Sequence, residues 1–287
     1  MERLVFIGPG RVGLALGQAI SRAVGELDLL YQGRRPEPPA HPLFHQGVAR
    51  YQYGLERPAE GTSAVFLTVP DAVLPELAVA LAARGPAPGG CAAFHTSGAL
   101  GADPLAPLHA QGYEVGTFHP LQAIANPISG AQHLFGSAFA ISGEPAALAT
   151  ARRLIGLLGG TGITVPTTRR PLYHAAAVFA SNYLVALLHE AADIFQDAGA
   201  TREEAERALT ALARGTLDNV EELGIEGALT GPLLRGDVET VELHLRTLDP
   251  RDAALYAALG RRTLAWVRDR IPQEAASRLD ELFERAP

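Results

Sequence analysis

The sequence predicts an α/β domain with a doubly wound, mainly parallel sheet, followed by an all-α domain. Short apolar segments alternate with helical stretches as far as about residue 165, which is the order of strands and crossover helices in a parallel sheet. From Arg169 onward no segment has the pattern of a strand. A chain of 287 residues is long enough for two domains that each bury a core. We therefore expect a sheet domain at residues 1–166 and a helical domain at residues 167–287.

The first strand, Leu4 to Ile7, runs directly into a glycine pattern that we call the glycine turn: Gly8-Pro9-Gly10-Arg11-Val12-Gly13. Its first glycine allows a tight turn, its second lets backbone approach a pyrophosphate, and its third lets the next helix pack on the strand. The N-terminus of that helix favours anions. In a chain with 30 glycines the pattern is also compatible with an ordinary turn. The strand before it and the helical segment from Val12 to Val24 favour dinucleotide binding.

The second strand, Leu27 to Gln32, ends without the acidic residue that commonly holds the ribose of NAD. Instead it continues into Gly33, Arg34 and Arg35. Two guanidinium groups can hold a 2′-phosphate through charge-assisted hydrogen bonds. A solvated pair of loop arginines is the alternative. We expect NADP(H) rather than NAD(H), with Arg34 and Arg35 as its phosphate ligands.

Composition limits the other classes of protein. The net charge of -7 argues against a general nucleic-acid binder. The single cysteine cannot form an internal disulfide, we find no signal segment, and no apolar run reaches the roughly 18 residues of a membrane span. We therefore expect a cytoplasmic protein that does not enter a membrane. All 24 basic residues are arginine, so proton transfer falls to histidine, a carboxylate, tyrosine, cysteine or water.

Three later strands end in polar residues, and ligands of open parallel sheets bind at that edge. The segments are Thr68-Val69-Pro70-Asp71, His95-Thr96-Ser97-Gly98 and His119-Pro120. We expect the backbone at Val69, Pro70 and Thr96 to border the cofactor, and Ser97 and His119 to contact the substrate. The alternative for His95 and His119 is that they only cap strand ends. Further strands are expected at 48–53, 138–142 and 162–165.

A long apolar helix from Leu172 to about Ala198 carries the remaining candidates. Helical periodicity places His174 and Ser181 on one face, with Asn182 beside it. His174 is suited to proton delivery or, alternatively, is a hydrogen-bonded core residue. Farther along, Arg235 could clamp a substrate carboxylate or lie at the surface, and Asp237 should cap the helix that begins at Val238.

Together these segments resemble an uncharacterised family of two-domain Rossmann-like proteins, over nearly the whole chain. That family is similar to a group that includes 6-phosphogluconate, 3-hydroxyisobutyrate and prephenate dehydrogenases, ketopantoate reductase and pyrroline-5-carboxylate reductase. The resemblance implies an NADP-binding domain, a helical domain like that of 6-phosphogluconate dehydrogenase through which the protein forms a homodimer, and a cleft between the domains.

The resemblance also implies an NADP-dependent oxidoreductase. Several of these relatives carry a catalytic lysine at the start of the long helix, where this chain has His174, and prephenate dehydrogenases use a histidine followed by proline, as in His119-Pro120. The leading hypothesis is hydride transfer from NADPH to a small carbonyl acid, such as a ketopantoate-like 2-oxo acid. His174 or His119 would donate the proton. Ser97, Ser181 and Asn182 would orient the substrate and Arg235 would hold its carboxylate. The alternatives are a reductase of pyrroline-type imines and a non-catalytic NADPH sensor; no metal site is expected.

Overall fold

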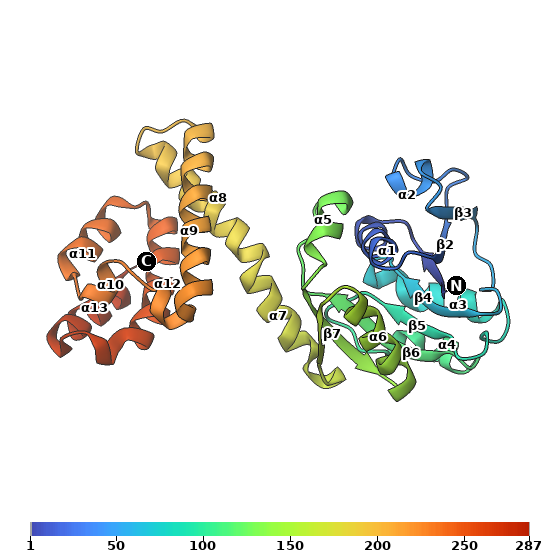
Figure 1. The fold of residues 1–287 in the computed structure, drawn as a ribbon. Coiled ribbons are helices and arrows are strands. Elements are labelled where there is room, and N and C mark those ends of the chain that lie inside the picture. The colour runs from blue at the N-terminus through green and yellow to red at the C-terminus, as the bar shows by residue number, and fades with distance from the viewer. Residues whose placement is uncertain (1, 287) are drawn as a thin grey trace. The chain divides into compact units, whose positions relative to one another are not determined.

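The computed structural model describes residues 2–286, and the chain divides into two compact units, residues 1–181 and 182–287 (Figure 1). The first unit contains an eight-stranded sheet in the order β3-β2-β1-β4-β5-β6-β7-β8. Every neighbouring pair is parallel except β6 and β7. The predicted mainly parallel sheet is therefore confirmed. The strands are β1 Glu2–Ile7, β2 Leu27–Gly33, β3 Ala49–Tyr53, β4 Thr62–Leu67, β5 Ala92–His95, β6 Glu114–Pro120, β7 Ala138–Gly143 and β8 Thr161–Thr164.

Both faces of the sheet are buried, as a doubly wound sheet requires. Along β1, Leu4 and Phe6 enter one core cluster, while Val5 and Ile7 enter the other, because successive side chains of a strand point to opposite faces. Residues of α1 and α6 pack in the first cluster and residues of α3 and α4 in the second. The helices of this unit are α1 Arg11–Ala23, α2 Pro42–His45, α3 Leu74–Ala82, α4 Ala106–His109, α5 Pro127–His133, α6 Pro145–Leu157 and α7 Arg170–Ala180, with the 3₁₀ turns η1 Asp71–Val73, η2 Asp103–Leu105 and η3 Thr167–Arg169.

A row of phenylalanine rings crosses the sheet near the ends of β1, β4, β5 and β6 and near the start of the antiparallel strand β7. Ring centroids are 4.7 Å apart from Phe6 to Phe66, 5.3 Å from Phe66 to Phe94, 5.8 Å from Phe94 to Phe118 and 5.1 Å from Phe118 to Phe139. Contacts at these separations stabilise packed aromatic side chains. Since His95 follows Phe94 and His119 follows Phe118, this rigid row fixes where the polar strand ends lie.

The predicted long helix is two helices. Regular helix α7 ends at Ala180, because the backbone of Ser181 turns away with φ −119° and ψ −70°. The two units also divide here, after Ser181, rather than near Pro166. The reason is that α7 begins with Arg170, which is completely buried in the sheet unit and ties the helix to it. The Ser181 N–H still donates to the Ala177 carbonyl at 3.0 Å, so the regular helical spacing reaches Ser181 and ends there.

The second unit is helical in all its described secondary structure, as predicted. Its core contains Val241, Leu264, Leu279 and Phe283. The Asp237 carboxylate accepts a hydrogen bond from the Thr240 N–H at 3.1 Å, which confirms the predicted cap. The helices are α8 Asn182–Asp197, α9 Arg202–Ala228, α10 Pro232–Arg235, α11 Val238–Thr247, α12 Pro250–Val267 and α13 Gln273–Arg285, with a 3₁₀ turn η4 at Arg268–Arg270.

One helical segment of the described chain, Thr167–Asp197, is long and apolar enough to cross a membrane by length and composition, with a mean hydropathy of 1.3. This corrects the expectation that no apolar run has that length. Polar residues interrupt this segment, but alanine, valine and leucine surround them. The mean hydropathy over 18 residues is therefore high although no apolar run continues unbroken over that length. None of that window is buried inside the described chain.

Candidate functional site

The glycine turn is shaped by the end of β4. Gly8 has φ +99°, and a Cβ there would lie 2.7 Å from Val69 Cγ1 and 2.8 Å from the Thr68 carbonyl oxygen. A Cβ on Gly13 would collide with the Thr68 hydroxyl, which donates a hydrogen bond of 2.6 Å to the Gly8 carbonyl. Only glycine satisfies both the backbone conformation at the first position and the close packing at the other.

The start of α1 has the properties of an anion site. The N-cap residue, Gly10, supplies no side-chain hydrogen bond, and the first turn carries no acidic side chain. Around Gly10 a Cβ would meet only the Thr68 carbonyl oxygen, at 3.8 Å. The helix is held in place by Tyr31, whose hydroxyl donates to the Gly13 carbonyl at 2.8 Å. Unpaired N–H groups on a fixed helix end beside open space fit a pyrophosphate.

The end of β2 presents two free arginines. The Gln32 side chain is buried and makes two 3.2 Å hydrogen bonds with the backbone of Glu56, so it belongs to the fold. Arg34 and Arg35 are exposed, and within residues 2–286 neither forms an ion pair. The Tyr51 hydroxyl donates to the Arg35 carbonyl at 2.6 Å, which holds the backbone of this loop. Both guanidinium groups are thus available to a phosphate.

His95 at the end of β5 is a structural residue in this arrangement. Its ring is fully buried. Nδ1 accepts the Ser97 N–H at 3.1 Å, which leaves Nε2 to donate to the Gly101 carbonyl at 2.6 Å. Burial lowers the pKa of His95, which favours this neutral form. Both ring nitrogens are occupied, in agreement with the interpretation of His95 as a strand-end cap.

Ser97 is linked to Asp71, the first residue of the turn η1 that follows β4. Its hydroxyl donates to the Asp71 carboxylate at 2.7 Å and accepts the Leu100 N–H at 3.2 Å. A serine hydroxyl has one hydrogen to donate, so Ser97 offers a substrate only a lone pair while this bond lasts. Asp71 was not predicted as a site residue, although it lies in one of the polar strand-end segments.

His119, Tyr173 and His174 form a group that we call the His–Tyr cluster. His119 Nδ1 and the Tyr173 hydroxyl lie 2.8 Å apart, and the rings of His119 and His174 meet edge to face with centroids 5.9 Å apart. His174 Nδ1 is buried and has no hydrogen-bond partner in the described structure. A Cβ on Gly98 would lie 2.5 Å from His174 Nδ1 and 2.8 Å from His119 Nε2. Glycine at this position is what allows both rings to reach the end of β5.

A buried arginine lies beside this cluster. Arg170 donates to the Ser97 carbonyl at 2.8 Å and to the Thr117 hydroxyl at 2.9 Å, and its guanidinium carbon is 5.9 Å from the centre of the Tyr173 ring. No carboxylate in residues 2–286 pairs with it, and its Nε has no partner. A buried, unpaired charge is costly, and perturbed charges concentrate at functional sites.

The charge on Arg170 changes the acidity of its neighbour. The pKa of His119 is lowered to about 4, first because the ring is buried and then because Arg170 and His174 oppose a second positive charge, while Asp71 partly offsets them. His119 is therefore neutral at neutral pH. Sequence reasoning did not select Arg170 or Tyr173, since nothing in the order of residues shows that the first is buried or that the second reaches β6.

The other predicted residues have separate surroundings. Ser181 is half-buried at the break after α7, and Asn182 is exposed at the start of α8. In the second unit Arg235 is exposed at the end of α10, and 3.8 Å separates its guanidinium from the Asp237 carboxylate. Within residues 2–286 no group of three or more histidine, cysteine or acidic side chains is arranged to hold a metal ion.

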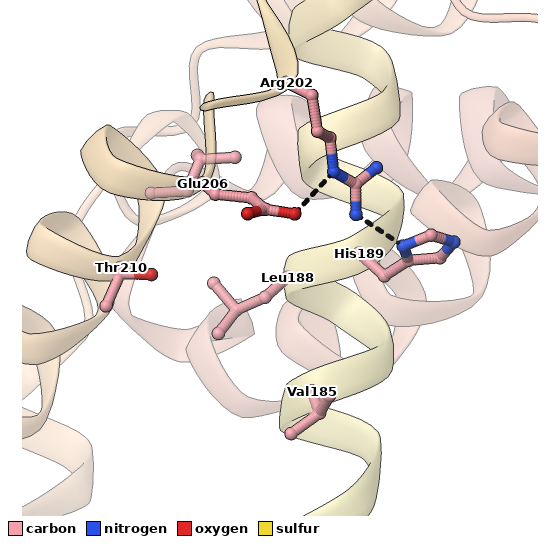
Figure 2. A pocket seen from close by; sticks show the side chains of 7 residues that line it. Val185, Leu188, His189, Arg202, Glu206 and Thr210 are labelled. Atoms are coloured by element: carbon pink, nitrogen blue, oxygen red, sulfur yellow. Dashed lines mark hydrogen bonds and ion pairs between the residues drawn. The ribbon is translucent and has the colours of Figure 1, made fainter. Parts of the chain in front are cut away.

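A pocket of about 210 Å³ lies between α8 and α9 (Figure 2). Arg202 is its cation, and it is already paired with Glu206 at 2.7 Å, with Asp193 at 2.5 Å and with His189 Nδ1 at 2.8 Å. This leaves no free charge for an anionic ligand. The lining residues, none of which was predicted as a site residue, are Val185, Leu188, His189, Arg202, Glu206, Leu209 and Thr210.

The sheet order, the glycine turn and the helical second unit define a two-domain Rossmann-like protein. Residues 50–120 match the family model described as a Rossmann-like domain, and residues 137–263 match the model described as a domain of unknown function, DUF2520. The chain therefore combines a Rossmann-like domain with a DUF2520 domain. No curated protein matches it.

Solved structures share the fold over almost the whole chain. Protein TM1727 from Thermotoga maritima is 23% identical, with 98% of each chain covered and a TM-score of 0.66. The "putative NADP oxidoreductase BF3122" from Bacteroides fragilis is 22% identical, with 91% of this chain and 97% of that chain covered and a TM-score of 0.69. Pyrroline carboxylate reductase from Plasmodium falciparum, solved with NADP bound, is 13% identical, with 99% and 97% covered and a TM-score of 0.60.

Proposed function

We propose that this protein is an NADP-dependent oxidoreductase that transfers hydride between NADPH and a small carbonyl acid. The observation that carries the proposal is the start of α1, an uncapped helix end behind a glycine turn, in the same unit as the exposed pair Arg34 and Arg35. The names of the similar structures, an NADP oxidoreductase and a reductase with NADP bound, support the same class.

Each part of the cofactor has residues that would hold it. The backbone of Gly8, Pro9, Gly10, Arg11, Val12 and Gly13 would bind the pyrophosphate. Arg34 and Arg35 would bind the 2′-phosphate, and Val69, Pro70 and Thr96 would border the remainder. When bound, the dinucleotide supplies the hydride.

Several residues of the sheet unit would act on the substrate. The His–Tyr cluster would manage the proton that accompanies hydride transfer, next to Ser97 and its partner Asp71. Ser181 would orient the carbonyl of a ketopantoate-like 2-oxo acid. Asn182 and Arg235 belong to the helical unit, and their roles toward the carbonyl and the carboxylate stay predictions from the sequence. The choice of substrate rests on the resemblance to the dehydrogenase and reductase group, and the chemistry of these side chains is compatible with it.

Reduction of a cyclic imine is a second candidate function, and the lowered pKa of His119 favours it. A neutral His119 is a poor proton donor, whereas an iminium ion is already activated and needs none from the protein. A panel of 2-oxo acids and cyclic imines, followed by NADPH absorbance, distinguishes the two candidates. Tight NADPH binding without turnover on any of them would instead favour a sensor.

The cofactor assignment is tested by binding. The double variant Arg34→Ala, Arg35→Ala should raise the Kd for NADPH by about 10- to 100-fold, since it removes up to two charge-assisted hydrogen bonds, and should leave the Kd for NADH within about twofold. Arg84→Ala, which removes an exposed arginine elsewhere on this unit, is the control. Equal affinity of the wild type for NADPH and NADH would contradict the assignment.

We also propose that the protein is a homodimer through its helical unit. Large apolar side chains are exposed on α8 and α9, with exposed fractions of 68% for Val185, 66% for Leu212 and 64% for Ile225. Such side chains concentrated on neighbouring helices are typical of a covered interface. A second copy of the chain is the occupant we propose.

A further inference from the structure

Two histidine–tyrosine pairs in the described part of the chain have nearly identical geometry. His119 Nδ1 lies 2.8 Å from the Tyr173 hydroxyl, with ring centroids 5.7 Å apart and an interplanar angle of 86°. In the helical unit His244 Nδ1 lies 2.9 Å from the Tyr256 hydroxyl, with centroids 5.6 Å apart and the same angle. The hydrogen bond alone therefore does not set the first pair apart. Its surroundings do.

Within residues 2–286, the first of these two pairs has a buried cation beside its tyrosine ring. Arg170 lies one turn before Tyr173 on α7, with its guanidinium carbon 5.9 Å from the ring centre. It cannot swing away, because the Ser97 carbonyl and the Thr117 hydroxyl hold it in the interior. A fixed positive charge in a buried setting stabilises a negative charge that develops nearby. A phenolate at Tyr173 would be such a charge.

The protonation states point to the same side chain. His119 is disfavoured as an imidazolium by its burial, by Arg170 and by His174. Burial raises the pKa of Tyr173 while Arg170 opposes the rise, so the phenol keeps its proton throughout neutral pH. A phenol is still far more acidic than the alcohol formed from a carbonyl. At neutral pH Tyr173 is therefore a protonated phenol that can act as an acid, whereas His119 is a neutral imidazole and a poor acid.

The two ring nitrogens of His119 can serve this arrangement. When Nδ1 carries the hydrogen, it donates to the Tyr173 oxygen and leaves the phenolic hydrogen free to point at a substrate. Nε2 then faces the same point beside Gly98 as His174 Nδ1. The absence of a side chain at Gly98 leaves the room that both rings occupy.

We infer that Tyr173 is the catalytic acid of the proposed reduction, with His119 and Arg170 stabilising the phenolate that it leaves. The inference rests on the proposed function. Hydride adds to the carbonyl carbon, the π electrons move to the carbonyl oxygen, and that oxygen takes the proton of Tyr173 as the phenolic O–H bond breaks. The products are an alcohol, NADP⁺ and tyrosinate, which solvent reprotonates. Oxidation runs through the same steps in reverse.

The test compares Tyr173→Phe with Tyr256→Phe, each of which loses only the hydroxyl of a matched pair. With the carbonyl acid identified in the panel, Tyr173→Phe should lower kcat by about 10²- to 10⁴-fold, the usual contribution of general acid catalysis. Its KM and its Kd for NADPH should stay within about twofold of the wild type. Tyr256→Phe should retain wild-type kcat.

The pH profile of the wild type is a second test that needs no variant. A tyrosine donor predicts a kcat for reduction that is flat through neutral pH and falls only in the alkaline range. A His119 donor predicts a fall of about tenfold per pH unit above a pKa of about 4. The second profile, or a Tyr173→Phe variant with wild-type kcat, would overturn the inference.

Failure of the inference and failure of the proposed function give different results. A wild type that reduces a carbonyl acid, together with an equally active Tyr173→Phe, leaves the function standing and removes Tyr173. A wild type that turns over only imines, or no substrate at all, rejects the proposed carbonyl reduction, and the assignment of Tyr173 is rejected with it.

Discussion

Acidification should destabilise the sheet unit well before its carboxylates titrate, because His119 has to remain neutral in the fold. Its pKa is about 4 in the folded protein against an ordinary value of 6.5. Between these values the unfolded chain binds more protons than the folded chain, so stability falls as pH falls from 6.5 toward 4. Above pH 6.5 the contribution of neutral His119 to the free energy of unfolding is fully present, and below pH 4 it is fully lost.

The size of the effect follows from the same pair of values. Linkage gives a loss of about 2 kcal/mol in the free energy of unfolding between about pH 7.5 and 5 for this one side chain. His41 and His95 also have lowered pKa values and act in the same direction. Glu2 and Asp28, whose pKa values are lowered by arginine partners, contribute only at more acidic pH.

Urea unfolding measured at several pH values tests this prediction. Far-UV circular dichroism follows the whole chain, whereas fluorescence of Trp266, the single tryptophan, follows the helical unit. His119→Asn keeps a hydrogen-bonding side chain next to Tyr173 but cannot titrate, so its stability should depend less on pH by about 2 kcal/mol over the same range. The reasoning is refuted if wild type and His119→Asn lose equal stability on acidification.

Three further predictions concern the cofactor turn, its support and the assembly. Gly13→Ala would push against the Thr68 hydroxyl, so NADPH affinity in a titration should fall by at least about tenfold, at a stability cost of about 1–3 kcal/mol; unchanged affinity would contradict the close packing. Tyr31→Phe removes a buried hydrogen bond to the Gly13 carbonyl and should lower the free energy of unfolding by about 1 kcal/mol in urea melts, and an equal or higher stability would count against that bond. Light scattering after size exclusion should give twice the chain mass of 30.2 kDa, and Val185→Glu with Leu212→Glu should shift the protein toward monomer. A monomeric wild type, or one that requires detergent, would reject the homodimer.

Much of the fold can be predicted because its determinants are local. The alternation along Leu4, Val5, Phe6 and Ile7 already implies a strand buried on both faces, and the next residues imply a turn that only glycine can make. Arg34 and Arg35 can be predicted as phosphate ligands because they stand after the second strand, where NAD-binding chains commonly have an acidic residue. The break at Ser181 is not visible in this way, since helical periodicity continues on both sides of it.

The sequence by itself therefore determined the parallel sheet, the glycine turn and the helical second half, since each depends on neighbouring residues or a short period. The tertiary structure decided which polar side chains meet. Arg170 reaches a carbonyl 73 residues earlier in the chain, and Tyr173 reaches a histidine 54 residues earlier. Whether a histidine carries a proton depends on burial and on charges brought together from such distances. The sequence alone makes His119 a candidate proton donor, because an ordinary histidine can carry a proton near neutral pH. The structure lowers its pKa to about 4 and so favours Tyr173, which lies beside it, as the donor.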